Sequence, residues 1–254
     1  MNDATLSVGS LEAQPGTKAR GTVRADLGTL TADIPLTLVN GSRPGPRVVI
    51  TAGVHGGEFT PIDAVVRLAD RLEPGEVHGQ VIICPVANPP AVYQGRLNVS
   101  PVDGVNLNRV FPGDPAGGPT ERLGAWLFSH LIDGADVYID LHCGGIDQVL
   151  RDFVGHRLTG DPDLDKATAE LAGSFGIEDV ILGLKDSPRR GGRTRAAGRG
   201  HGAPPCRRSA GGTAPPGRPR PGRLSPGPDP RMGLVRRCHG RGHGPVVPGV
   251  LLRR

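Results

Sequence analysis

The part of this sequence that can form a hydrophobic core ends abruptly near residue 187. Residues 1–187 contain 14 Lys and Arg against 24 Asp and Glu, whereas residues 188–254 contain 16 Arg, no Lys and a single Asp. The second segment is rich in Arg, Gly and Pro and has almost no apolar periodicity before Val246. Such a segment cannot bury enough apolar surface to offset its ordering entropy. We therefore expect residues 187–254 to be an unstructured tail.

Between residues 19 and 186, apolar runs of strand length alternate with segments of helical spacing. The expected strands are 22–24, 34–39, 48–52, 81–86, 136–141 and 180–182, and the expected helices are 61–72, 120–132 and 163–175. This alternation indicates an α/β domain whose sheet is mostly parallel or mixed and is flanked by helices. Because the first residues are polar, we expect residues 1–18 to be disordered.

The composition excludes several other classes of protein. The N-terminus lacks a basic region followed by an apolar run, so no signal peptide is expected. No stretch of about 18 apolar residues is present, which argues against a membrane span and a membrane partner. The four cysteines form no C-x-x-C pair, so we expect neither a disulfide scaffold nor a cysteine zinc site. A cytoplasmic location is the default prediction.

Two motifs at the ends of expected strands carry candidate metal ligands. His55 and Glu58 lie in Gly-Val-His-Gly-Gly-Glu after the strand 48–52, and His142 lies in Asp-Leu-His at the end of the strand 136–141. Ligands gather at the carboxyl ends of strands in α/β sheets. Two His and one Glu, with a fourth position open for water, form a known catalytic zinc arrangement. The sequence therefore predicts one zinc ion per chain.

A third motif, Asn-Leu-Asn-Arg-Val-Phe-Pro-Gly at residues 106–113, offers a site for a carboxylate. Its Asn108 amide stands beside the Arg109 guanidinium, and paired N–H donors match the two oxygens of a carboxylate. A substrate with a free carboxylate is therefore expected near these two residues.

These three motifs, in this order, resemble those of the succinylglutamate desuccinylase/aspartoacylase family, which is related to the zinc carboxypeptidases. The similarity covers roughly residues 20–186. Within the family, the chain is most similar to the N-acetyl-diaminobutyrate deacetylases of ectoine breakdown. The resemblance implies a zinc carboxypeptidase-like fold and hydrolysis of small N-acyl amino acids. It also implies that Asn108 and Arg109 hold the substrate carboxylate.

The sequence departs from the family pattern in two places. The family usually has an Arg, which polarises the scissile carbonyl, at the position of Asn98; Arg96 is nearby and could replace it if the loop shifts. The family's general base is a Glu in an apolar-Glu-x-Gly strand beyond residue 186, and this chain has no Glu after Glu178. The catalytic base is therefore not identified in this sequence, and we expect the activity to be impaired.

The tail has two interpretations. Its excess of Arg, Gly and Pro, with few aromatics, is typical of an out-of-frame reading of a GC-rich gene, and we favour this interpretation. The alternative is binding of nucleic acid through phosphate neutralisation. The lack of interleaved aromatic residues argues against that alternative.

Other residues and functions are left with alternatives. Asp140 either orients a ligand or ends a strand, Asn106 is either a turn residue or a substrate contact, and Glu121 is either a helix N-terminal charge or a substitute proton acceptor.

The leading function is a zinc-dependent deacylase of N-acyl amino acids. The rivals are a zinc carboxypeptidase acting on peptides and an inactive metal- or nucleic-acid-binding remnant. The sequence does not indicate the oligomeric state.

Overall fold

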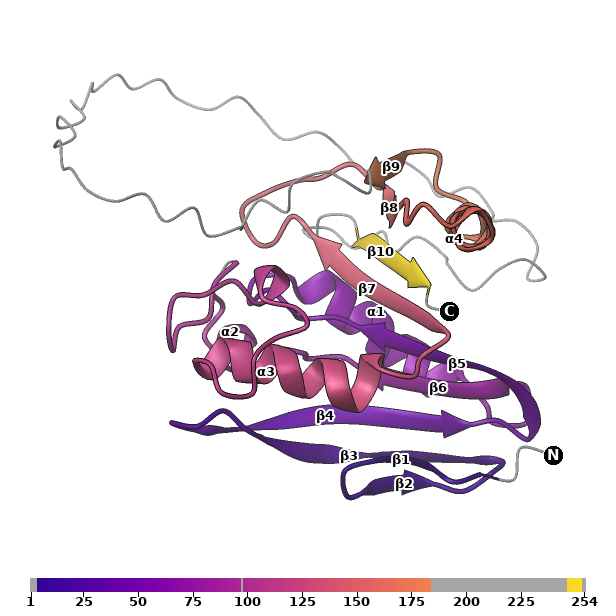
Figure 1. Ribbon diagram of the computed structural model, residues 1–254, viewed down its shortest axis with the longest axis horizontal. Coiled ribbons are helices and arrows are strands. Elements are labelled where there is room, and N and C mark those ends of the chain that lie inside the picture. Colours follow the sequence, from indigo (N-terminus) through magenta and orange to yellow (C-terminus); the bar gives the residue numbers. More distant parts are fainter. Residues whose placement is uncertain (1–3, 97, 184–245, 253–254) are drawn as a thin grey trace, which may run out of the picture. The chain divides into compact units, whose positions relative to one another are not determined.

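The computed structural model describes residues 4–96, 98–183 and 246–252. Eight of its strands form one sheet: β3 (Thr17–Asp26), β4 (Thr31–Asn40), β5 (Arg43–Thr51), β6 (His78–Cys84), β7 (Val137–Cys143), β8 (Val154–Arg157), β9 (Val180–Gly183) and β10 (Val246–Leu252). The order across the sheet is β3-β4-β6-β5-β7-β10-β8-β9 (Figure 1).

The sheet is mixed. Strand β5 runs parallel to both β6 and β7, and β8 runs parallel to both β9 and β10. The pairs β3–β4, β4–β6 and β7–β10 are antiparallel. The parallel strands β5, β6 and β7 therefore end at the same edge of the sheet, and the predicted ligands follow or end two of them. The predicted α/β fold with a mixed sheet flanked by helices is confirmed.

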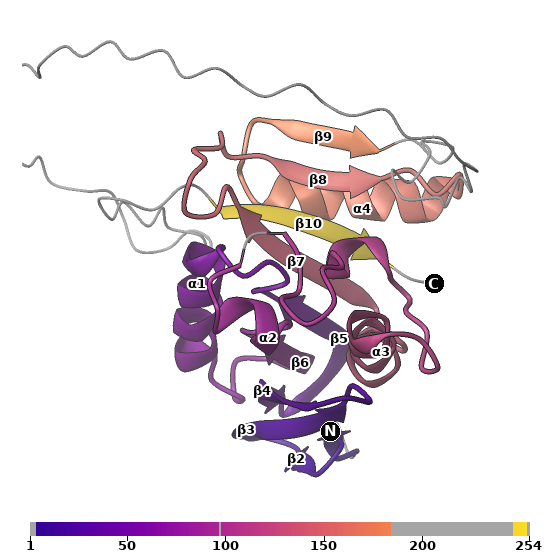
Figure 2. The same ribbon diagram turned by 90° about the vertical axis from the view of Figure 1, so that its left-hand side faces the viewer.

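The helices are α1 (Phe59–Arg71), α2 (Pro89–Val92), the 3₁₀ turn η1 (Leu107–Arg109), α3 (Pro119–Leu127), the π-helical turn η2 (Phe128–Ile132) and α4 (Pro162–Ser174). Figure 2 shows α1 on one side of β5 and β6 and α3 on the other. Helix α4 has a clear start signal. The Asp161 carboxylate accepts the N–H groups of Asp163 and Leu164, and Pro162 occupies the first turn of α4.

Each face of the sheet has its own apolar core. On one face, α1 contributes Val65 and Ala69, which pack with Ile50 and Ile83 of the central strands. On the other face, residues of α3 pack with β4 and with the N-terminal hairpin described below. Val65 and Ala69, two residues of the apolar stripe that predicted the helix 61–72, therefore contact the sheet, whereas Val66 of the same stripe is 40% exposed.

The prediction that residues 1–18 are disordered is wrong for the residues that the structure describes. Strands β1 (Leu6–Val8) and β2 (Leu11–Ala13) form an antiparallel hairpin, and β3 already begins at Thr17. Leu6, Val8 and Ala13 are buried in the core with β4. The Asn40 amide donates to the carbonyl oxygens of Ala4 and Ala13, which fastens the hairpin. Alternating apolar residues, too few to stand out in the sequence, account for this order.

The prediction of an unstructured tail also differs from the structure in one segment. Residues 246–252 form β10, which pairs along β7 from Val246 opposite Cys143 to Leu252 opposite Val137. Apolar residues return in this segment of the sequence, after the long stretch that is rich in Arg, Gly and Pro. The rest of the predicted tail lies outside the described residues.

Smaller differences concern the segments around the site. Within the expected helix 120–132, α3 ends at Leu127, and the π-helical turn η2 follows it directly. The short elements β8, α2 and η1 were not predicted, because each is too short to show a period. Among the described helices, none is long and apolar enough to cross a membrane.

Replacing Leu127 by Ala should lower the free energy of unfolding by about 2–5 kcal/mol, because the change leaves a cavity in a close-packed core. Leu127 is 1% exposed at the end of α3. Val66→Ala on α1 is the control, since Val66 is 40% exposed and its truncation should change the free energy by less than about 0.5 kcal/mol. Urea unfolding curves measure both, and equal losses would contradict this assignment of the core.

Candidate metal centre

The loop between β5 and α1 places His55 and Glu58. Gly53 begins it with a positive φ of 66°, a conformation that glycine adopts readily. A Cβ atom at Gly56 would collide with the carbonyl oxygens of Arg96 and Ala91, so only glycine fits beside this neighbouring segment. The glycines of the motif therefore serve two purposes: they turn the chain sharply after the strand, and they bring the Arg96 backbone against the loop.

Glu58 stands at the N-cap position of α1 but does not cap it. Its side chain makes no hydrogen bond to the first turn of the helix. One carboxylate oxygen, Oε1, lies 2.9 Å from Nδ1 of His55, and the other, Oε2, lies 2.9 Å from Nδ1 of His142. The carboxylate is thus shared between two imidazoles that are 87 residues apart in the chain. It faces the site rather than its own helix.

His142 reaches this cluster from the carboxyl end of β7. In the parallel pair β5–β7, Thr51 lies level with Asp140, so the residues that follow them emerge at the same edge. One ligand atom from each of His55, Glu58 and His142 lies within 4.8 Å of the others, and the two rings have their centroids 5.0 Å apart. These three side chains can therefore hold one metal ion. The sequence predicted this set of residues, and the structure brings all three together.

Burial and charge shift the pKa values of two candidate ligands in opposite directions. Burial disfavours the charged Glu58 carboxylate, but hydrogen bonds and charge from His142 and His55 outweigh it and lower its pKa. Burial also disfavours a charged His142, but the charge and hydrogen bond of Asp140, together with those of Glu58, raise its pKa to about 10. In the metal-free chain, His142 is therefore an imidazolium held between two carboxylates.

Each imidazole has a second partner at its far nitrogen. His142 Nε2 lies 2.6 Å from Oδ2 of Asp140, and His55 Nε2 lies 3.2 Å from Oδ1 of Asn106. Such partners fix the tautomer and the direction of a ligand ring. Of the two readings of Asp140, the structure supports the one in which it orients a ligand. Asn106 is a turn residue that begins η1 and also contacts His55.

The predicted substrate-binding residues follow Asn106 directly. Its Oδ1 atom also accepts the N–H of Asn108 at 2.9 Å, and Asn108 and Arg109 form the 3₁₀ turn η1. The Arg109 side chain is exposed, with Nη1 donating to the Asn108 carbonyl oxygen at 2.9 Å. One amide oxygen therefore links a candidate metal ligand to the turn that carries the Asn-Arg pair. Their role toward a substrate carboxylate stays a prediction.

Arg96 is exposed, and its backbone packs against the His55 loop through Gly56. Asn98, two residues later, has a positive φ of 54°. The segment that would carry a carbonyl-polarising Arg therefore lies beside the cluster, with an Arg two positions earlier than in the family pattern. Whether the Arg96 guanidinium contacts a substrate stays a prediction.

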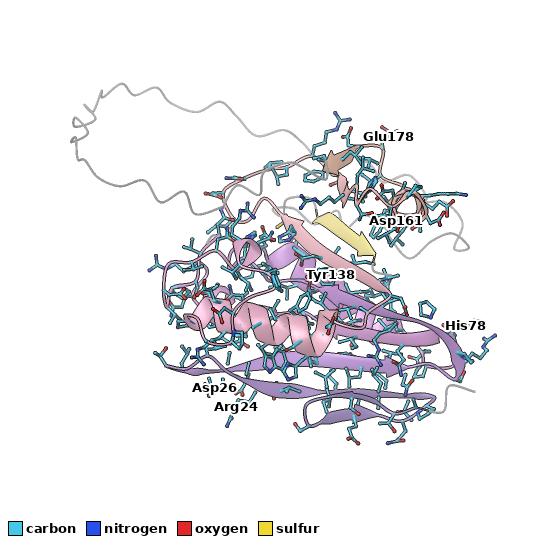
Figure 3. All side chains as sticks on the ribbon, viewed as in Figure 1. Arg24, Asp26, His78, Tyr138, Asp161 and Glu178 are labelled. Atoms are coloured by element: carbon cyan, nitrogen blue, oxygen red, sulfur yellow. The ribbon has the colours of Figure 1, made fainter. Side chains whose placement is uncertain are left out.

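Glu121, the possible substitute proton acceptor, has a structural role. Glu121 Oε2 accepts the N–H of Gly118 at 3.0 Å at the start of α3, which agrees with its reading as a helix N-terminal charge. Cys143 is buried, and burial raises the pKa of its thiol. Figure 3 shows His78 at the start of β6 and Glu178 beside β9, both away from Tyr138 on β7.

Two residues around the cluster were missed by sequence reasoning. Thr51 Oγ1 lies 2.6 Å from Asp140 Oδ1 and 2.9 Å from the hydroxyl of Tyr138. A signal for one of them was present: Tyr138, Asp140 and His142 alternate along one apolar strand and so share a face. Polar residues repeated at this spacing inside a buried strand indicate a polar network.

Comparison with known proteins identifies the family of this chain. The succinylglutamate desuccinylase/aspartoacylase catalytic domain matches residues 44–216. The chain belongs to this family. The resemblance seen in the three motifs is thereby confirmed, and the matched range contains all six predicted site residues.

Relatives within the desuccinylase/aspartoacylase family include a curated enzyme and several solved structures. The N-alpha-acetyl-L-2,4-diaminobutyric acid deacetylase of Halomonas elongata is 39% identical over 149 residues, which are 59% of this chain and 43% of that enzyme. A succinylglutamate desuccinylase/aspartoacylase structure from Rhodobacter sphaeroides is 36% identical with a TM-score of 0.60, covering 65% of this chain and 52% of that one.

A further solved structure is the product-bound ectoine utilization protein EutE (DoeB) from Ruegeria pomeroyi. It is 26% identical with a TM-score of 0.57, and the match covers 74% of this chain and 57% of that protein. The present chain thus spans about half the length of these family members.

The metal-free chain should lose stability as the pH rises from 6.5 toward 10. The folded-state pKa of His142, about 10, lies above its ordinary value of 6.5, so its contribution is complete below pH 6.5 and is lost as the pH rises through 10. Urea unfolding with a chelator present measures the effect as the difference between wild type and His142→Gln. A difference that does not change over this range would show that the imidazole is not charged in the folded state.

Proposed function

We propose that the chain binds one zinc ion through His55, Glu58 and His142 and that it is a deacylase of N-acyl amino acids. The observation that carries the proposal is that the Nδ1 atoms of both imidazoles converge on the two oxygens of one buried carboxylate. Two nitrogens and a carboxylate are a ligand set that zinc takes in catalytic sites with an open fourth position.

The spacing of the ligand atoms suits such an ion. Zinc bonds of about 2.1 Å at tetrahedral angles separate neighbouring ligand atoms by roughly 3.4 Å. The two His–Glu distances are 2.9 Å, so the atoms of each pair need to move apart by only a fraction of an ångström, and all three ligand atoms lie within 4.8 Å of one another. The partners Asp140 and Asn106 leave both Nδ1 atoms directed at the centre of the cluster.

The residues around the ion would hold and orient the substrate. When bound, zinc supplies a water molecule with its pKa lowered to about 7 and polarises the amide carbonyl. Asn108 and Arg109 would bind the substrate carboxylate, and Arg96 would lie toward the scissile carbonyl. Because η1 is fastened to His55 through Asn106, this binding fixes the distance between the carboxylate and the reacting amide.

The chain would hydrolyse its substrate poorly, because the carboxylates that could replace the family's general base are already engaged. Glu58 contacts both imidazoles, Asp140 contacts His142 and Thr51, and Glu121 closes the first turn of α3. All three are occupied by contacts within the protein. The family's base belongs to a strand beyond residue 186, where this sequence has no Glu.

We propose small N-acyl amino acids as the substrate class. The Halomonas elongata relative is named for N-alpha-acetyl-L-2,4-diaminobutyric acid, and the family for succinylglutamate and for N-acylated aspartate. The Asn-Arg pair supports an amino acid with a free carboxylate. The cytoplasmic location and the lack of a nucleic-acid partner stay predictions from the sequence.

Purified chain should contain close to one zinc per molecule, and His142→Ala should lose most of it, because two remaining ligands bind zinc weakly. His130→Ala is the matched control, since His130 is exposed and stacks on Trp126. Metal analysis after dialysis measures all three proteins. Equal zinc content in wild type and His142→Ala would contradict the metal site.

The chain should hydrolyse N-acetyl-L-2,4-diaminobutyrate about 10²–10⁴-fold more slowly than an intact relative, because the acid–base contribution is missing. A panel of N-acetyl and N-succinyl amino acids against short peptides separates a deacylase from a carboxypeptidase.

Reading the encoding DNA in its other two frames should reveal an apolar-Glu-x-Gly strand after codon 186, and a chain restored to that frame should regain the rate. Wild-type activity equal to that of the relative would contradict the impairment.

A further inference from the structure

Two hydroxyl groups lie behind the carboxylate that holds His142. Thr51 ends β5, is 1% exposed, and faces Asp140 across the parallel pair β5–β7. Its Oγ1 atom lies 2.6 Å from Asp140 Oδ1 and 2.9 Å from the hydroxyl of the partly buried Tyr138. Asp140 Oδ2, the other oxygen, contacts His142 Nε2 at 2.6 Å. The four side chains form one continuous hydrogen-bonded row.

The chemistry of the groups fixes the direction of every hydrogen bond in this row. An ionised carboxylate only accepts, so Thr51 must donate its single hydroxyl hydrogen to Asp140. The oxygen of Thr51 then accepts from the hydroxyl of Tyr138. On the other side, His142 must carry a hydrogen on Nε2, which leaves Nδ1 as the only nitrogen that can bind a metal ion. The row thus specifies the tautomer that a neutral, metal-binding His142 would adopt.

The hydroxyls also limit how Asp140 can move. Without Thr51, Oδ1 would lose its 2.6 Å hydrogen bond, and the carboxylate could rotate about its terminal torsion, which is broad in energy. The imidazole that depends on Oδ2 would lose its fixed direction at the same time. Mutation of a residue that orients a metal ligand typically lowers the metal affinity by about 10–100-fold.

We propose that Thr51 and Tyr138 are positioning residues for the candidate metal ligand His142. Their hydroxyls hold Asp140 in the orientation that fixes the His142 ring with Nδ1 toward Glu58. This inference rests on the proposed metal site. It assigns a role to two residues that lie outside the three family motifs.

The test compares metal affinity among variants of the full chain. Thr51→Val removes the hydroxyl and keeps the shape, Thr51→Ser keeps the hydroxyl, and Tyr138→Phe removes the donor to Thr51. Competition with a chromophoric chelator measures the Co²⁺ affinity, and the visible spectrum of bound Co²⁺ reports the ligand geometry. We expect Thr51→Val to weaken binding about tenfold and to alter the spectrum, Tyr138→Phe to act in the same direction by less, and Thr51→Ser to remain close to wild type.

A matched control separates positioning from the general cost of losing a buried hydroxyl. Thr168 is 2% exposed on α4, and its hydroxyl donates to the Leu164 carbonyl oxygen at 2.7 Å, away from the cluster. Thr168→Val should lower stability without changing the Co²⁺ affinity or spectrum. Thr51→Val that is folded and has wild-type affinity and spectrum would overturn the inference. If Thr51→Val does not fold, an unchanged affinity and spectrum in Tyr138→Phe would overturn it instead.

The outcome is distinguishable from failure of the proposed function. If wild type binds Co²⁺ and His142→Ala does not, the metal site stands whatever the hydroxyl variants do. If wild type binds none, the metal site fails, and the inference is judged on the imidazole ¹⁵N signals of His142 in the metal-free chain. Loss of the hydroxyl should then shift the Nε2 signal in Thr51→Val and leave it unchanged in Thr51→Ser; an identical signal in wild type and Thr51→Val would overturn the role of the hydroxyls.

Discussion

Glu58 is only 6% exposed and carries a charged carboxylate. The arrangement of the site follows from how that charge is stabilised. A carboxylate removed from water is costly unless other groups replace its hydration. Each of its oxygens therefore takes one imidazole nitrogen, and each imidazole is held in turn by a further oxygen. The cluster grows outward from this requirement, through Asp140 to the hydroxyls on one side and through Asn106 to η1 on the other.

The candidate metal ligands could be predicted from the sequence because their chemistry is distinctive. A His and a Glu three positions apart in a glycine-rich loop after a strand, with another His at the end of a second strand, suggest metal binding from residue type and place alone. The hydroxyls of Thr51 and Tyr138 do not stand out by residue type, because Thr and Tyr are ordinary strand residues, and only Tyr138 has a further signal in its alternation with Asp140 and His142. Their role depends on the register of two strands that are distant in the sequence, which only the fold establishes.

Errors in the predicted fold have a similar physical origin. The N-terminal hairpin is ordered by a few apolar side chains and by the Asn40 amide, and the contribution of that amide cannot be read from the hairpin's own sequence. The long elements were predicted well because a helix such as α1 repeats its apolar stripe several times. Short elements such as η1 and β8 take their structure from neighbours rather than from their own pattern.

The site depends on a single register. In β5–β7, Thr51 is paired with Asp140, and a slip of one residue would turn the side chains of Asp140 and His142 to the opposite face of the sheet. The ligands come from segments that are far apart in the chain, so the cluster can assemble only after this non-local pairing has formed. Apolar pairs along the two strands, such as Ile50 with Ile139, hold the register that the polar groups use.

The position of Glu58 carries a cost for the helix that follows it. Ser, Thr, Asp or Asn at an N-cap position can stabilise a helix by about 0.5–2 kcal/mol relative to a residue that does not cap, and Glu58 gives its carboxylate to the imidazoles instead. Selection for thermal stability alone would therefore favour replacing Glu58 by a capping residue, and the replacement would remove the centre of the cluster. At the first turn of α1, the protein therefore has a less stable helix start because the Glu58 carboxylate is placed in the cluster.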